Sequence, residues 1–192
     1  MIRLSLPLAL TTMAALAGCS PDQDEATPAE GAAENAPAEP STPETLGSAA
    51  LALADGTSAG TVELVSDDGA LSFEVAVTGI PEGTHGFHLH TTGQCEAPDF
   101  TSAGGHLNPA EREHGRENPA GSHLGDLPNL VVNADGTAST TVALDAESGN
   151  AIDSLFDADG TAVMIHADPD DYRTDPTGNA GSRIACGVLE RT

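Results

Sequence analysis

Leu71-Ser72-Phe73-Glu74-Val75-Ala76-Val77 carries an apolar side chain at every second position, and this alternation indicates a β fold. Successive side chains of a strand point to opposite faces, so the pattern predicts a strand with one face in a core. In the preceding segment, residues 61–65, apolar and polar side chains alternate in the same way. The segment between them, Ser-Asp-Asp-Gly-Ala at 66–70, has the composition of a turn. We therefore expect an antiparallel pair at 61–77.

Further short segments with strand character follow this pair along the chain. Residues 130–132 and 140–144 flank Asn-Ala-Asp-Gly at 133–136, where we expect a second hairpin. No segment has a convincing helical stripe, although residues 150–157 can form one turn. Short strands separated by Gly/Asp turns predict an antiparallel β-sandwich or barrel. The remaining expected strands are 86–91, 161–166 and 184–190.

The first eighteen residues have the character of a bacterial lipoprotein signal peptide. Arg3 supplies a positive start, residues 4–17 are mostly apolar, and small residues precede Cys19. An apolar stretch this short is a targeting segment, and the thiol of Cys19 can carry a lipid anchor to a membrane. An ordinary cleaved signal with a coincidental cysteine is the alternative. We expect a signal peptide over 1–18 and lipidation of Cys19.

Residues 19–45 are expected to form a disordered acidic tether, because Pro, Ala, Glu, Asp, Ser and Thr cannot bury enough surface to order it. The folded domain is expected over 46–192. Ser20 stands where many lipoproteins of the inner membrane have an aspartate. We therefore expect a periplasmic protein that is anchored to the outer membrane.

If Cys19 is lipidated, Cys95 and Cys186 remain as a pair that would normally form a disulfide in an oxidising compartment.

The chain is strongly acidic, with a formal net charge of -24 and no lysine. Phosphate binding needs a basic surface, so the charge excludes nucleic acid as a partner. The same charge favours solubility and is compatible with a salty medium.

Six of the seven histidines and one aspartate form a pattern that predicts a two-metal site. Histidine is the commonest protein ligand of copper and zinc, and this set exceeds what a single tetrahedral zinc needs. Two of these histidines are two apart on an expected strand and share a face; alone, such a pair is more often a solvated surface. Most of the others lie in or beside two long irregular stretches, 93–129 and 167–182. The set comprises His88, His90, His106, His114, His123, Asp126 and His166.

These residues and their surroundings resemble the copper/zinc superoxide dismutase family over 46–192. The resemblance rests on Gly86-Phe87-His88-Leu89-His90, on the spaced run from His106 to Asp126 with Gly125-Asp126-Leu127, and on Thr177-Gly178-Asn179-Ala180-Gly181-Ser182-Arg183-Ile184-Ala185-Cys186-Gly187. It implies an all-β, antiparallel Greek-key β-sandwich or barrel with two long functional loops. It also implies disproportionation of superoxide to oxygen and hydrogen peroxide by copper that alternates between Cu(II) and Cu(I), beside a structural zinc.

The resemblance further implies a role for each site residue. His106 would bridge the metals and supply a proton, and Asp170 would accept hydrogen bonds from His88 and His114. Arg183 would guide the anion, Thr177 would flank its channel, and His85 would be structural. The implied copper ligands are His88, His90, His106 and His166. The implied zinc ligands are His106, His114, His123 and Asp126. The implied disulfide joins Cys95 and Cys186.

Two other functions fit the same residues less well. A periplasmic copper/zinc buffer or copper-delivery protein would lack a copper ligand or the arginine, and neither is missing. An inert structural or adhesion sandwich would not need six organised ligands. Tyr172 and the short stretch 90–95 are typical of the bacterial branch of the family. Family members include monomers and dimers, so the sequence leaves open whether the chain is a monomer or a homodimer.

Electrostatic steering of superoxide is expected to be weak in this protein. The family usually places positive residues in the loop after the last copper ligand, whereas this loop has only Arg173 against Asp168, Asp170, Asp171 and Asp175. The metal ions keep the site locally positive, and distant acids are screened beyond about 8 Å at physiological salt. We predict efficient turnover that depends little on ionic strength. A steep fall of kcat/KM with added salt would contradict this prediction.

Overall fold

The protein is described by a computed structural model that covers residues 42–145 and 148–192. The expected signal peptide at 1–18, the lipidation site Cys19 and the tether as far as residue 41 lie outside the described residues. Within the described part, no helix is long and apolar enough to cross a membrane. The first strand begins at Glu44, two residues before the expected start of the domain.

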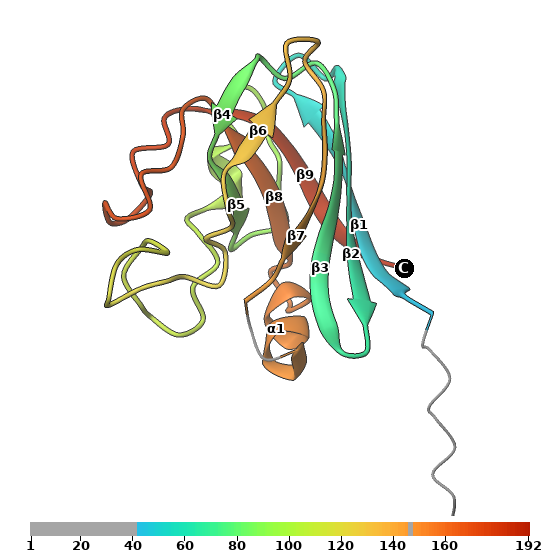
Figure 1. Cartoon of the computed structure of the whole chain (residues 1–192), viewed down its shortest axis with the longest axis vertical. Coiled ribbons are helices and arrows are strands. Elements are labelled where there is room, and N and C mark those ends of the chain that lie inside the picture. The colour runs from blue at the N-terminus through green and yellow to red at the C-terminus, as the bar shows by residue number, and fades with distance from the viewer. Residues whose placement is uncertain (1–41, 146–147) are drawn as a thin grey trace, which may run out of the picture. The chain divides into compact units, whose positions relative to one another are not determined.

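Seven antiparallel strands form one curled sheet, a half-barrel, in the order β5-β8-β9-β1-β2-β3-β7 (Figure 1). A separate two-stranded sheet pairs β4 with β6. The expected antiparallel all-β fold is therefore confirmed. The strands are β1 (Glu44–Leu53), β2 (Ser58–Asp67), β3 (Ala70–Val77), β4 (Gly83–His85), β5 (Phe87–His90), β6 (Leu130–Val132), β7 (Ala138–Ala143), β8 (Thr161–His166) and β9 (Arg183–Arg191).

The expected pair at 61–77 is confirmed as the β2–β3 hairpin. Leu64 lies opposite Phe73 in its register, and both side chains are fully buried. The connection is the two-residue turn Asp68-Gly69, with φ of 48° and 83°. Positive φ at both central residues is the geometry that matches the twist of paired strands, which explains why Asp-Gly is favoured there.

The expected hairpin between 130–132 and 140–144 is wrong. A turn does form, with Asn133 N–H donating to Thr137 O at 2.9 Å, but its two strands enter different sheets. β6 pairs with β4 and β7 pairs with β3. β6 buries alternate side chains, and β7 buries only Ala138 and Val142. A period of two identifies the buried face and not the partner strand.

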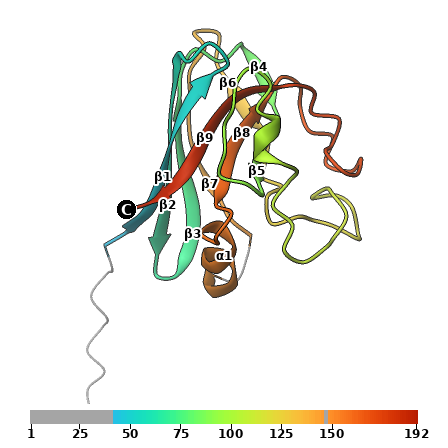
Figure 2. The ribbon, with the colours of Figure 1, turned by 180° about the vertical axis from the view of Figure 1, so that it is seen from behind.

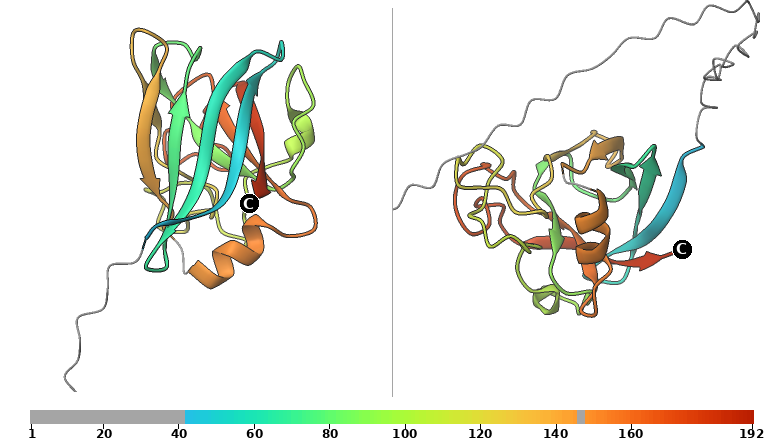
Figure 3. Two further views of the ribbon diagram at one scale, coloured as in Figure 1. Left: turned by 90° about the vertical axis from the view of Figure 1, so that its right-hand side faces the viewer. Right: turned by 90° about the horizontal axis from the view of Figure 1, so that it is seen from below.

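β1 was not expected from the sequence, although it lies between β2 and β9 in the sheet. The buried side chains of β1 include Ala49 and Leu51. Alanine is depleted in strands, so the sequence of this segment is only a weak indication of a strand. The single turn expected at 150–157 is a two-turn helix, α1 (Ser148–Leu155), which lies at one end of the barrel (Figure 3). A short 3₁₀ turn, η1 (Thr101–Ala103), interrupts the first long loop.

The two long loops lie together on the side of the barrel that carries β5 (Figures 1 and 2). Isolated bridges join His88 to Asp126 and His90 to His106, so the first loop covers the outer edge of β5. Two backbone hydrogen bonds of Leu89, from its N–H to Gly125 O at 3.0 Å and from Leu107 N–H to its carbonyl at 2.8 Å, continue this contact. Edge pairing thus brings the loop histidines to the strand histidines.

Candidate metal centre

The first ligand group consists of four buried histidines that β5, β8 and the first long loop bring together. One ligand nitrogen from each lies within 4.8 Å of the other three. His88 and His90 are on one face of β5, as their spacing predicts. His166 follows a register shift after Ile165 on β8, an irregularity of the kind that re-aims a side chain. The group is His88, His90, His106 and His166.

Hydrogen bonds to one nitrogen of a ring leave the other nitrogen facing the centre of this group. His88 Nε2 donates to Asp170 Oδ2 at 2.7 Å, and His90 Nδ1 donates to Gly104 O at 2.9 Å. His166 Nδ1 donates to Gly181 O at 3.3 Å. Because a neutral imidazole carries one N–H, the opposite nitrogens present lone pairs. Nε2 of His90 and Nε2 of His166 accordingly face each other at 3.4 Å.

Two nitrogens of the first group are buried without any hydrogen-bond partner, namely His88 Nδ1 and His106 Nε2. A buried polar atom without a partner is costly, and native proteins retain few of them without a reason. Four imidazole lone pairs that converge in a buried site suit a copper ion. The residues present therefore fit such a metal.

The second ligand group is built around one carboxylate oxygen in the first long loop. Asp126 Oδ1 lies 2.9 Å from His106 Nδ1, 3.0 Å from His114 Nδ1 and 3.1 Å from His123 Nδ1. Three imidazole nitrogens and one carboxylate oxygen form a closed donor set that suits zinc. His106 belongs to both groups, with Nδ1 directed to the second and Nε2 to the first.

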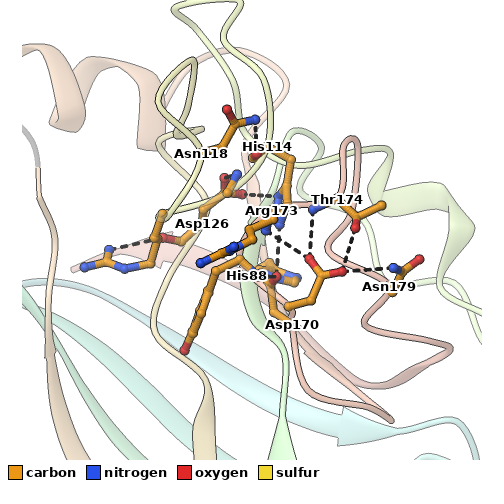
Figure 4. A network of polar contacts seen from close by, with 12 residues as sticks. His88, His114, Asn118, Asp126, Asp170, Arg173, Thr174 and Asn179 are labelled. Carbon is orange, nitrogen blue, oxygen red and sulfur yellow. Dashed lines mark hydrogen bonds and ion pairs between the residues drawn. The ribbon is translucent and has the colours of Figure 1, made fainter.

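Asp170 joins the two groups from the second long loop (Figure 4). Its Oδ2 accepts from His88 Nε2 and its Oδ1 accepts from His114 Nε2 at 3.0 Å. Both side-chain contacts are fully buried. The expected pair of hydrogen bonds to Asp170 is therefore present, and contacts of this kind fix the orientation and tautomer of a ligand ring.

The environment holds three of these rings, His90, His106 and His166, neutral and both carboxylates ionised when no metal is bound. Burial lowers the pKa of His90 to about 2 and that of His166 to about 3. Burial also lowers the pKa of His106 to about 4, although Asp126 opposes it. For the two aspartates, burial is outweighed by hydrogen bonds from histidines, which bring each pKa well below its usual value. Neutral imidazoles and ionised carboxylates are the protonation states that metal ions need.

His114 differs because it contacts both carboxylates. Burial alone would lower its pKa, but the hydrogen bonds to Asp126 and Asp170 raise it to about 9. The metal-free second group is thus held together by a charged imidazolium between two carboxylates. Binding of a cation there must release this proton.

Arg183 lies beside the first group and is anchored by carbonyl oxygens of the first loop. Its Nη1 donates to Phe100 O at 2.5 Å and its Nη2 donates to Gly104 O at 2.6 Å. Gly104 O also accepts from His90, so one carbonyl orients both the arginine and a histidine. Burial lowers the pKa of Arg183, but arginine stays charged in proteins.

The disulfide Cys95–Cys186 is present, as expected, with a Cα–Cα distance of 5.7 Å. It ties the first long loop to β9, three residues from Arg183. Phe100 packs in the same buried cluster as Cys186. The bridge therefore fastens the loop segment whose carbonyls hold the guanidinium.

His85 and Thr177 are the remaining residues that the family resemblance singled out. His85 belongs to neither group; its Nδ1 is 2.8 Å from His166 O and its Nε2 is 2.9 Å from Pro81 O. Thr177 is an exposed residue of the second loop. The sequence did not reveal that Asp175 Oδ1 accepts from His114 N–H at 2.6 Å, nor the contacts of Asn129 and Tyr172 with Asp170. Only their closeness to ligand motifs hinted at them.

A histidine-rich two-metal centre on an antiparallel β-barrel defines the class of this protein as a metalloprotein with a redox-capable site. Residues 58–189 match the family model of copper/zinc superoxide dismutase (SODC). The chain belongs to the copper/zinc superoxide dismutase family. It is thus an oxidoreductase that uses copper and zinc and acts on superoxide.

Relatives and solved structures agree with this membership. A copper/zinc superoxide dismutase of Aquifex aeolicus is 40% identical over 139 residues, which cover 70% of this chain and 82% of the relative. One from Caulobacter vibrioides is 40% identical over 142 residues, 71% of this chain and 80% of the relative. The crystal structure of a superoxide dismutase-like protein from Bacillus subtilis superposes with a TM-score of 0.69 at 40% identity, covering 74% of this chain and 97% of that chain. The Brucella abortus Cu/Zn enzyme gives 0.62 at 32% identity, over 78% and 100%.

Gly178 offers a test of the link through Asp170. Its φ is +60°, and a Cβ there would collide with the Asp170 carboxylate and lie 2.6 Å from His114 Nε2. We predict that Gly178→Ala displaces Asp170 and lowers metal affinity by about 10- to 100-fold, measured by competition with a chelator. Gly56→Ala is the matched control, since Gly56 has φ +84° and open space around it. An affinity of Gly178→Ala equal to that of Gly56→Ala would contradict the predicted displacement of Asp170.

Proposed function

We propose that the enzyme disproportionates superoxide at a copper ion held by the first group, beside a zinc ion held by the second group. The observation that carries this proposal is the pair of buried nitrogens without partners, His88 Nδ1 and His106 Nε2, which face the first group. In the overall reaction two superoxide anions and two protons give one oxygen and one hydrogen peroxide. When bound, copper supplies the electron chemistry by alternating between Cu(II) and Cu(I), which zinc cannot do.

His106 is proposed to carry one of the protons. Its Nδ1 is held at Asp126, so the ring can keep its position while Nε2 gains or loses a proton. A fixed ring of this kind can protonate a small anion without a rearrangement of the loop.

Arg183 is proposed to orient the superoxide anion. The guanidinium has five N–H donors in a planar fork, and two of its nitrogens are engaged by Phe100 O and Gly104 O. Donors that remain free can form charge-assisted hydrogen bonds to an anion. Both anchors are backbone carbonyls, so the guanidinium is held in place beside His90 without a direct ion pair to a carboxylate of the described residues, and Asp99 acts on it only from a longer distance.

Zinc is proposed to have a structural role. The second group draws its ligands from the first long loop alone, and Asp126 Oδ2 is already engaged by the N–H groups of Gly115 and His123. A closed site of this type stabilises a loop and leaves no open position for a substrate. The complete first group and the anchored Arg183 favour catalysis over metal storage.

The ligand assignment predicts separate effects for two substitutions. His166→Ala should abolish copper retention and lower dismutase activity by at least about 100-fold while zinc is kept. His123→Ala should release zinc first, since His123 belongs to the second group alone. Metal content and activity measured on both variants check the assignment. If the unmodified protein binds metal at both sites but does not turn over superoxide, the proposal is refuted.

We also propose export to the periplasm and a lipid anchor at Cys19. The lipoprotein-type sequence supports this, and so does the disulfide, which is typical of oxidising compartments. Cys19→Ser should move the protein from the membrane fraction to the soluble fraction of cells and remove the mass of the lipid. Unchanged membrane association of this variant would argue against lipidation.

A further inference from the structure

We propose that Tyr172 is a positioning residue for both metal groups and that it acts through Asn129 and Asp170. The inference rests on the proposed ligand assignment and adds a residue with no ligand role. Tyr172 is the only tyrosine of the chain and lies in the second long loop, partly exposed. Its side chain contacts Asn129, which binds Asp170, and its backbone contacts Asp170 directly.

The hydroxyl of Tyr172 holds Asn129 in place. Asn129 N–H donates to the Tyr172 hydroxyl oxygen at 2.7 Å. The Asn129 side chain in turn forms two hydrogen bonds with the backbone of Asp170. Its Nδ2 donates to Asp170 O and its Oδ1 accepts from Asp170 N–H, both at 2.9 Å. Two hydrogen bonds from one planar amide fix both the position and the direction of this peptide segment.

The backbone of Tyr172 holds the Asp170 carboxylate itself. Its N–H donates to Asp170 Oδ1 at 2.6 Å, and its carbonyl accepts from Glu117 N–H at 3.1 Å. Tyr172 has φ of 63°, a conformation that bulky residues rarely adopt and that surrounding contacts must hold. Glu117 belongs to the first long loop, so these contacts also fasten the two loops to each other.

Asp170 transmits this positioning to both groups. Among the described residues, its carboxylate has three hydrogen-bond donors, which are His88 Nε2, His114 Nε2 and Tyr172 N–H. Tyr172 is therefore the donor that fixes the carboxylate independently of the rings it must orient. A shift of Asp170 would turn His88 in the first group and His114 in the second.

Tyr172→Phe tests the inference because it removes one hydroxyl and keeps the ring. Thr174→Val is the matched control, since Thr174 lies in the same loop and donates its hydroxyl to Asp171 at 2.6 Å but has no contact with Asp170. In the metal-loaded protein we expect Tyr172→Phe to release zinc to a chromogenic chelator about 10-fold faster and to change the Cu(II) electron paramagnetic resonance spectrum. Thr174→Val should leave both measurements unchanged.

A double variant examines the route of the effect. In Asn129→Ala both side-chain hydrogen bonds to the Asp170 backbone are absent, so adding Tyr172→Phe should not accelerate zinc release further. Additive effects of the two substitutions would overturn the route through Asn129. Wild-type zinc release and an unchanged spectrum in Tyr172→Phe would overturn the positioning role. If Tyr172→Phe does not fold, Asn129→Ala alone must release zinc faster, or the inference fails.

A metal-free measurement keeps this inference distinct from the proposed function. The ring N–H protons of His88 and His114 that bond to Asp170 can be followed by NMR without any ion. Tyr172→Phe should shift both signals or broaden them, and Thr174→Val should not. Unmodified protein that fails to hold copper and zinc would refute the proposed function, whereas unshifted ring signals would refute the role of Tyr172.

Discussion

The structure of the site depends on the fixation of each buried imidazole by a protein oxygen. Five of the six rings have one nitrogen within hydrogen-bond distance of an oxygen outside the ligand groups, which is either an Asp170 carboxylate oxygen or a backbone carbonyl. His106 differs, because it directs one nitrogen to each group. A buried polar ring is tolerated only when its hydrogen-bonding capacity is met, so these oxygens determine which nitrogen faces the metal. Ligand geometry is thus imposed by the scaffold before any ion arrives.

Those oxygens come from segments that are distant in sequence, and the fold brings them together. The first long loop, which pairs with the edge of β5, supplies the carbonyls of Gly104 and Arg112. The second loop supplies Asp170 and Gly181. The disulfide and the contacts of Tyr172 hold these loops against the barrel and against each other. The second loop therefore orients ligands of the first loop and of the barrel strands, although it contributes no ligand to either group.

Prediction from the sequence succeeded where a local pattern carries the information. Asp68-Gly69 identifies its hairpin, because few residues accept positive φ at two successive positions. The seven candidate ligands were named by chemistry and spacing, and the structure brings them into two groups. The partner of β6 and the existence of β1 depend on long-range pairing, which alternation along one strand does not encode. The hydroxyl contact of Tyr172 with Asn129 is invisible for the same reason.

The carbonyl oxygen of Gly104 links the position of the His90 ring to that of the Arg183 guanidinium. One oxygen accepts from His90 and from Arg183, so the ring and the guanidinium share its two lone pairs. Any substitution that tilts this peptide plane alters the donor strength of the ring and the reach of the cation together. A substitution near Gly104 that changes the position of His90 therefore also changes that of Arg183, so evolution selects the two positions together.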